Sequence, residues 1–121
     1  EIVVLGAFGG ARLDLTIANA LLLAGPAHAA IDLRAEAGPD TVRALRGPGR
    51  RPLAGRIGAT VSLVPVGTVT GVRTEGLAYP LAGETLDLGR ARGVSNAIVT
   101  VPAAVSCDSG VLLIIERRAD A

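Results

Sequence analysis

The spacing of apolar residues changes at Pro26, and this change limits the folds that the chain can adopt. Before it, Ile2–Leu5 is a fully apolar run of the length of a buried strand in a parallel sheet, and residues 12–24 carry apolar side chains at helical spacing. After Pro26 no helical spacing returns, and short apolar runs alternate with turn residues. Residues 1–26 therefore predict one strand and one helix, and residues 27–121 predict strands alone.

The predicted helix has a signal at each end. Asp14 lies in its first turn, where a carboxylate stabilises the helix dipole, and Gly25 and Pro26 end it. Its apolar positions are Leu13, Ile17, Ala20, Leu21 and Ala24. One strand and one helix cannot bury both faces of the strand. We therefore expect residues 1–26 to be the last strand and helix of an α/β domain, and the chain, which starts with Glu1 rather than Met, to be an interior piece of a longer protein.

The apolar runs after Pro26 predict eight strands, at residues 29–35, 41–45, 60–66, 69–74, 84–88, 95–101, 104–107 and 111–116. The clearest turns between them are at residues 37–40, 47–49 and 107–110, which read AGPD, GPG and CDSG. Short strands at a spacing of roughly 8–12 residues are typical of a sandwich or a barrel. The predicted fold is mainly β: an antiparallel, jelly-roll-like β-sandwich over residues 27–121, preceded by the βα unit of residues 1–26.

Composition excludes several classes of function. Charged residues make up 19% of the chain and the net charge is +1, so no strong field attracts nucleic acid or an anionic membrane. The arginine run RALRGPGRRPLAGR lacks interleaved aromatic residues, and we expect a solvated loop there. No apolar run reaches the ~20 residues of a membrane helix. A single cysteine, Cys107, and a single histidine, His28, fit a cytoplasmic protein without a Cys/His zinc cluster.

Two stretches carry candidate functional residues, each with a structural alternative. In the first, GAFGGAR, Gly6, Gly9 and Gly10 can present N–H groups to an anion, and Arg12 can bind a phosphate, although a tight strand-to-helix turn explains the glycines as well. Asp14 can bind Mg²⁺, or it can only complement the helix dipole. Spacing alone does not separate these roles.

The second stretch runs from residue 73 to residue 98. Its Tyr79 is the only tyrosine of a chain with one phenylalanine and no tryptophan, and it lies among glycines and polar residues. A lone tyrosine can be a core residue, or its ring can stack on a flat heterocycle. Ser95 and Asn96 can bind the polar edge of such a ring, although a left-handed turn explains GVSN as well.

Taken together, the motifs of the chain resemble those of the thiamine pyrophosphokinase family. That family has a pattern G-A-x-G-G-R-x-D-H-x-L-A-N-x-x-L-L after a strand, and this chain has GAFGGARLDLTIANALLL. A later family block is matched by SLVPVGTVTGVRTEGLAYPL, and the final motifs by GVSNA and GVLLII. The matches follow one another in the family's order through nearly the whole chain.

The resemblance implies an enzyme that transfers pyrophosphate from ATP to the hydroxyl of thiamine and gives thiamine diphosphate and AMP. It implies catalytic roles for Arg12 and Asp14, phosphate binding by Gly9, Gly10 and Arg12, and Mg²⁺ as cofactor with Asp14 among its ligands. It also implies thiamine contacts from three residues of the β part: Tyr79, Ser95 and Asn96. Family members are homodimers whose site combines the α/β domain of one subunit with the sandwich of the other, so a homodimer is expected, and this piece alone is expected to be inactive.

Three positions depart from the family pattern. Ala11 is inserted before Arg12, Leu15 replaces a common histidine, and Ala97 replaces the usual glutamate after GVSN. These differences leave two alternatives to the enzyme: a sandwich that binds thiamine or another heterocycle without turnover, and a dimerisation domain without a ligand.

Overall fold

The computed structural model describes residues 2–5, 13–26, 32–89 and 91–120. It contains one helix, α1 (Leu13–Ala24), and nine strands within these residues. The strands are β1 (Ile2–Leu5), β2 (Leu33–Ala37), β3 (Asp40–Arg46), β4 (Gly49–Pro52), β5 (Thr60–Glu75), β6 (Ala82–Leu86), β7 (Asn96–Ala97), β8 (Ala104–Cys107) and β9 (Ser109–Arg117). The predicted strand, helix and mainly β remainder are confirmed.

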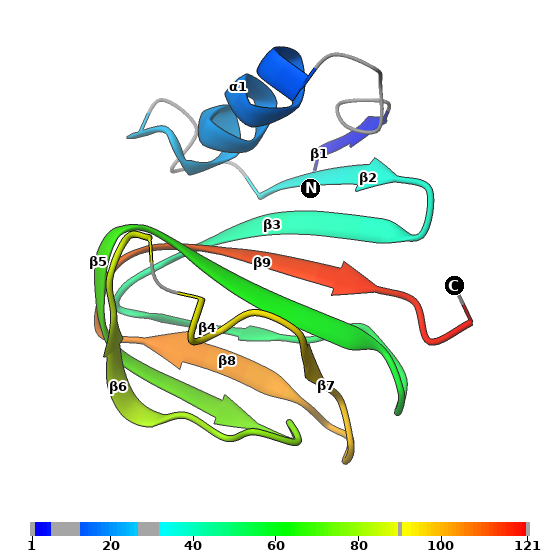
Figure 1. Cartoon of the computed structure of the whole chain (residues 1–121), viewed down its shortest axis with the longest axis vertical. Coiled ribbons are helices and arrows are strands. Elements are labelled where there is room, and N and C mark those ends of the chain that lie inside the picture. The colour runs from blue at the N-terminus through cyan, green and yellow to red at the C-terminus, as the bar shows by residue number, and fades with distance from the viewer. Residues whose placement is uncertain (1, 6–12, 27–31, 90, 121) are drawn as a thin grey trace.

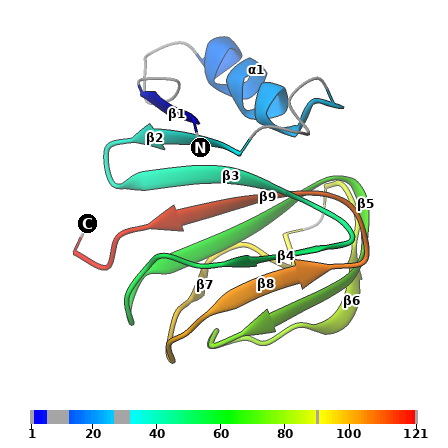
Figure 2. The ribbon, with the colours of Figure 1, turned by 180° about the vertical axis from the view of Figure 1, so that it is seen from behind.

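The strands form one sheet that curls until its two halves face each other (Figures 1 and 2). The path through the sheet is β1-β2-β3-β9-β5-β8-β4, and β6 and β7 also pair with β5. Only β1 and β2 are parallel, with α1 between them in the sequence, and the other pairs are antiparallel. The antiparallel sandwich expected from the sequence is therefore built from one continuous curled sheet. The division into domains at residue 26 stays a prediction.

Strand β5 belongs to both halves of the sheet. Its first part pairs with β9 and β7, and its last part pairs with β8 and β6. The sequence predicted two strands here, because Gly67 and Thr68 interrupt the apolar run. The structure has instead a register shift between Val66 and Thr70, with Gly67 at a φ of 89°. A bulge at a glycine bends a strand without ending it, so the two predicted strands are one.

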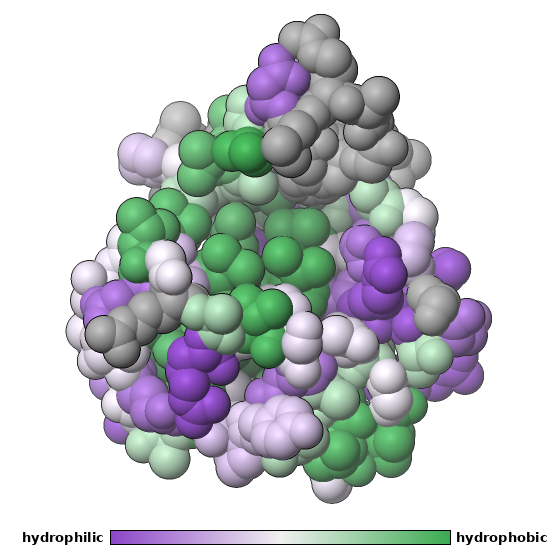
Figure 3. All heavy atoms as spheres, in the orientation of Figure 1, coloured by the Kyte–Doolittle hydropathy of each residue, from purple (hydrophilic) through white to green (hydrophobic). Residues whose placement is uncertain are grey.

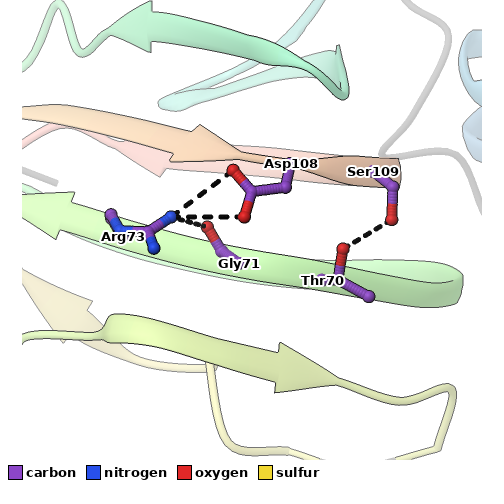
Figure 4. A network of polar contacts seen from close by, with 5 residues as sticks. All are labelled: Thr70, Gly71, Arg73, Asp108 and Ser109. Atoms are coloured by element: carbon purple, nitrogen blue, oxygen red, sulfur yellow. Dashed lines mark hydrogen bonds and ion pairs between the residues drawn. The ribbon is translucent and has the colours of Figure 1, made fainter.

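A polar network fixes the bend (Figure 4). Arg73 Nη1 donates to the carbonyl oxygen of Gly71 at 3.0 Å and lies 3.4 Å from the Asp108 carboxylate, between β8 and β9. The Asp108 N–H donates to the carbonyl oxygen of Thr70 at 2.8 Å. Gly71 has a φ of 64°, and a Cβ there would collide with Asp108. The predicted turn at CDSG is thus a tight corner that takes the chain from one half of the sheet to the other.

Other strand boundaries differ from the prediction. Residues 49–52, expected in a loop, form β4 and pair with β8. In this part of the arginine run, Arg50 pairs with Glu75 at 3.2 Å and Arg51 with Asp32 at 3.3 Å. The strand expected at 95–101 is reduced to the two residues of β7 and an isolated bridge between Leu77 and Ile98. The sequence did not predict β4, because two of its four residues are arginines and its other two are glycine and proline, which are uncommon in strands.

The main core lies between the two halves of the sheet. Side chains alternate along β5 and β9, so that Val61, Leu63, Leu112 and Ile114 point inward and are at most 1% exposed. Leu45 of β3 and Val105 of β8 belong to the same cluster. Buried residues from both parts of β5, Val61 and Leu63 in the first and Val69 and Val72 in the last, belong to this one core.

A smaller cluster lies between α1 and the outer face of β3 and β9. Leu23 and Ala24 of α1 pack there with Val42 and Leu113, and Figure 3 shows hydrophobic residues gathered on this face below the helix. Ile17 and Leu21, expected on the packed side, are 51% and 53% exposed. The helix is apolar around most of its circumference, so spacing alone could not select the buried side. Within the described residues, no helix has the length and apolarity needed to cross a membrane.

Arg46 attaches the helix to the sheet. Its Nη2 donates to the carbonyl oxygens of Leu23 at 3.2 Å and Gly25 at 2.8 Å, at the end of α1 where carbonyls have no partner in the helix. We expect Arg46→Ala to lower the free energy of unfolding in urea by about 1–2 kcal/mol. The exposed Arg56→Ala serves as control and should change it by less than about 0.5 kcal/mol. Equal urea midpoints for the two variants would show that this contact does not stabilise the helix.

Cys107 is buried in the main core and forms no disulfide with any residue that the structure describes. Burial first, and the negative charge of Asp108 second, raise the pKa of its thiol above the ordinary value of 9.0. Above pH 9.0 the unfolded chain loses the thiol proton before the folded protein does, so the free energy of unfolding falls as pH rises. Below this pH the thiol is protonated in both states and has no effect on stability. We expect the free energy of unfolding to decrease from about pH 9 upward, and Cys107→Ala to remove that part of the decrease. Identical pH profiles for the two proteins would contradict this expectation.

Candidate functional site

The structure brings Tyr79, Ser95 and Asn96 together beside the beginning of β5. Asn96 and Ala97 of β7 pair with Val61 and Thr60. The segment that carries Tyr79 lies along the other side of β7, where the N–H of Ala78 donates to the carbonyl oxygen of Ala97 at 2.9 Å. Residues far apart in the sequence therefore form one small surface, which Figure 1 locates at β7.

Asn96 is the buried support of this surface. Its side chain is enclosed, with the residue 5% exposed. Its Oδ1 accepts hydrogen bonds from the N–H groups of Tyr79 at 3.0 Å and Ala97 at 2.9 Å, and its Nδ2 donates to the carbonyl oxygen of Tyr79 at 2.7 Å. The amide thus takes the place of a neighbouring strand for Tyr79. Both acceptor positions of Oδ1 are used. The role of Asn96 is therefore to fix the backbone of Tyr79.

Tyr79 itself points into solvent. The residue is 65% exposed, which is unusual for the only tyrosine of a chain with so few aromatic residues. Its backbone is fixed by Asn96 at both its N–H and its carbonyl group. The alternative that Tyr79 is a core residue is therefore excluded. A rigid backbone with an exposed ring is a suitable platform for a flat molecule.

Ser95 lies beside it in a left-handed conformation. Its φ is 63°, the one positive value at a non-glycine residue within the described part of the chain, and its side chain is exposed. The N–H of Ser95 donates to Oγ of Ser62 on β5 at 3.0 Å. The turn alternative for GVSN is thus correct for the backbone, and it leaves the hydroxyl of Ser95 on the surface. Non-glycine residues with positive φ are uncommon and recur at functional sites.

Sequence reasoning missed the residues that hold this turn. Ser62 anchors Ser95, and Gly93 lies so close to β5 that a Cβ would come within 2.8 Å of the carbonyl oxygen of Leu63. Arg92 forms two hydrogen bonds to the carboxylate of Glu84 on β6, at 3.1 and 3.2 Å. Gly93, the first residue of GVSN, was the available signal, since close backbone approach requires glycine.

This surface has the chemistry of binding rather than of catalysis. It offers an aromatic face from Tyr79 and a hydroxyl from Ser95, with the exposed side chain of Val94 between glycine and serine. The arrangement therefore suits the binding of a flat heterocycle.

The other predicted site lies elsewhere. Asp14 is exposed in the first turn of α1, and Gly9, Gly10 and Arg12 lie outside the described residues, as does His28. In Figures 1 and 2, α1 lies at one end of the molecule and β7 toward the other. Within one chain, the helix that carries Asp14 and the surface that carries Tyr79 therefore do not form a common site. In the part of the chain that the structure describes, no three His, Cys, Asp or Glu side chains cluster to hold a metal ion.

Comparison with known proteins connects these features to one family. Residues 51–112, just over half of the chain, match the family model described as thiamin pyrophosphokinase, vitamin B1 binding domain. The matched segment contains Tyr79, Ser95 and Asn96 with all of β5. A search of curated proteins found no match.

Solved structures show the same fold. A thiamine pyrophosphokinase from Bacillus subtilis superposes with a TM-score of 0.86 at 23% identity, and one from Geobacillus thermodenitrificans with 0.81 at 24%. A thiamin pyrophosphokinase from Candida albicans gives 0.77 at 22%. These alignments cover 97%, 96% and 96% of this chain and 55%, 53% and 44% of the other chains. The chain thus spans about half the length of the structures that it matches.

Proposed function

Because the chain belongs to the thiamin pyrophosphokinase vitamin B1 binding domain family, we propose that it binds thiamine for an enzyme that pyrophosphorylates it. The parent enzyme would transfer pyrophosphate from ATP to the thiamine hydroxyl and release AMP. The observation that carries this proposal is the exposed Tyr79 ring, held through its backbone by the buried Asn96.

Thiamine has the chemistry that this surface suits. Its pyrimidine is a flat ring and its thiazolium carries a positive charge, so either ring gains from lying on the electron-rich face of Tyr79. The Ser95 hydroxyl would bond to a polar edge of the pyrimidine. Asn96 would contribute by holding the backbone of Tyr79 in place.

The phosphate chemistry would come from residues at the start of the chain. Asp14 would supply one carboxylate ligand to Mg²⁺, with the other ligands from ATP phosphates and water, the usual arrangement for this ion. Mg²⁺ would neutralise phosphate charge, and Arg12, with Gly9 and Gly10, would bind the phosphates. A single carboxylate does not make a metal site, so we propose that this chain alone is inactive. We propose separately that the enzyme is cytoplasmic, which the single cysteine of the chain supports.

We also propose a homodimer. The supporting observation is the separation of α1 from β7 within one chain (Figures 1 and 2). A site that used both Asp14 and Tyr79 would therefore need α1 of one subunit and β7 of the other. The half-exposed apolar side chains of α1, Ile17, Leu21 and Leu22, agree with a helix that is covered in the assembled enzyme.

Two measurements test the function. Isothermal titration calorimetry of this chain with thiamine should show saturable binding, and a coupled assay of the full-length parent with ATP, Mg²⁺ and thiamine should yield AMP and thiamine diphosphate. Binding without turnover would replace the enzyme with a sensor of thiamine. Absence of both would leave a dimerisation domain and refute the proposal.

A further inference from the structure

Ser62 places a hydroxyl on an apolar face of the sheet. Side chains alternate along β5, so Ser62 lies on the same outer face as Val64 and Val66. It is opposite Ile115 of β9, and these three apolar residues pack against the smaller cluster between α1 and the sheet. A polar group that is partly enclosed by such neighbours needs a hydrogen-bond partner. The partner of the Ser62 hydroxyl is the backbone of Ser95.

Ser95 lies between two points at which the chain pairs with β5. Before it, the carbonyl oxygen of Gly93 accepts a hydrogen bond from the N–H of Leu63 at 2.8 Å, and after it β7 begins at Asn96. Ser95 itself has a φ of 63°, and its N–H donates to Oγ of Ser62 at 3.0 Å. A side chain of β5 thus accepts the hydrogen bond of an N–H that is turned out of the strand pairing.

The φ of Ser95 decides where its hydroxyl points. For residues other than glycine the left-handed conformation is unfavourable, because Cβ approaches a carbonyl oxygen. The hydrogen bond to Ser62 offsets this cost. Without that bond, we expect Ser95 to relax to a negative φ, which rotates its Cα–Cβ bond and turns the exposed hydroxyl to another direction.

The segment before Ser95 is fixed by other contacts. Arg92 forms two hydrogen bonds to the carboxylate of Glu84 on β6, and Gly93 is buried against β5. Neither contact involves the hydroxyl of Ser62. We therefore expect loss of that hydroxyl to change the conformation at Ser95 without releasing the whole turn.

We propose that Ser62 is a positioning residue for the ligand of the Tyr79 surface. It holds Ser95 in the left-handed conformation that directs the Ser95 hydroxyl toward a polar edge of a heterocycle stacked on Tyr79. Ser62 acts through Ser95 and does not touch the ligand. This inference rests on the proposed binding of thiamine, and it adds a residue of β5 that the proposed ligand contacts do not include.

The test is isothermal titration calorimetry of thiamine with the original chain, Ser62→Ala, Ser95→Gly and the double variant. We expect Ser62→Ala to weaken binding about fivefold, the effect of one lost hydrogen bond. In the Ser95→Gly background the same substitution should change the affinity by less than about twofold, because glycine adopts a positive φ freely and has no hydroxyl to direct. Ser62→Thr keeps Oγ and should bind within about twofold of the original affinity.

Thr70→Ala is the matched control. It also removes a hydroxyl of β5, one that is hydrogen-bonded to Ser109 at the bend, and it should leave the thiamine affinity unchanged. A second measurement needs no ligand, since a strong NOE between the amide and α protons of Ser95 reports its positive φ. This NOE should be present in the original chain and in Ser62→Thr, and it should weaken in Ser62→Ala. If Ser62→Ala does not fold, Ser62→Cys, whose sulfur is a weak acceptor, replaces it in both measurements.

An unchanged affinity in Ser62→Ala, an equal loss in the Ser95→Gly background, or an unchanged NOE at Ser95 in Ser62→Ala would each overturn the proposal. The second of these results would make Ser62 a direct ligand contact. If the original chain binds thiamine and Tyr79→Ala weakens that binding, any of the three refutes the positioning role alone. If the original chain does not bind thiamine, the proposed function fails and this inference fails with it.

Discussion

Alanine at position 79 is expected to weaken thiamine binding about ten- to a hundredfold while leaving the fold intact. The substitution removes the exposed aromatic face, and stacking with a partly desolvated cation contributes about 1.5–3 kcal/mol. The backbone N–H and carbonyl of residue 79, which Asn96 holds, are retained in the variant. Because the residue is 65% exposed, stability should change by less than about 0.5 kcal/mol. Calorimetric titration with thiamine measures the affinity, and urea unfolding measures the stability.

Two controls make this result specific to the ring. Tyr79→Phe keeps the aromatic face and should bind thiamine within about threefold of the original affinity. Val101→Ala removes another half-exposed apolar side chain and should leave the affinity unchanged. If Tyr79→Ala bound thiamine as well as Tyr79→Phe does, the ligand would not lie on this ring.

Asn96→Ala is expected to lower the free energy of unfolding by about 3 kcal/mol. The substitution removes three hydrogen bonds and leaves the N–H groups of Tyr79 and Ala97 and the carbonyl of Tyr79 without their partner. Each buried group left unpaired costs about 1–3 kcal/mol, reduced where water enters. A loss of this size lowers the melting temperature of a domain of this length by roughly 10 °C.

The neighbouring residue is the control for this effect. Ser95→Gly keeps the backbone bond to Ser62 and replaces a residue at a φ of 63° with one that adopts this conformation freely, so stability should stay equal or rise slightly. Thermal and urea unfolding of both variants provide the comparison. Equal stability of Asn96→Ala and the original chain would show that the buried amide does not support Tyr79.

The order of the elements was predictable from the sequence because it depends on local signals. The apolar run at Ile2–Leu5, the helix before Gly25 and the turn at Gly38 and Pro39 follow from spacing and turn chemistry, and all are present. The continuity of β5 was not predictable, since Gly67 marks a loop and a bulge equally well in sequence. The buried side of α1 was also hidden, because the helix is apolar on the side of Ile17 as well as on the side of Leu23.

The three residues proposed to contact thiamine could be chosen from the sequence, but their different degrees of burial could not be predicted, and their role stays a prediction. Tyr79 stood out by its rarity, and its exposure agrees with the ligand-facing interpretation. Ser95 and Asn96 are adjacent and equally polar, yet one is exposed and the other is enclosed. That difference depends on a strand pair between Asn96 and Val61 and on the chain at Tyr79, which lie 35 and 17 positions away. Contacts of such separation leave no trace in local spacing.

The sharing of β5 between the two halves of the sheet has a consequence for molecular recognition. Two separate layers could slide or tilt against each other, whereas a strand paired in both halves cannot shift without breaking hydrogen bonds to β9 and β8 at once. The backbone beneath Tyr79 is fixed to the beginning of that strand through β7. A ligand therefore meets a preorganised surface, and little of its binding energy is lost to ordering the protein.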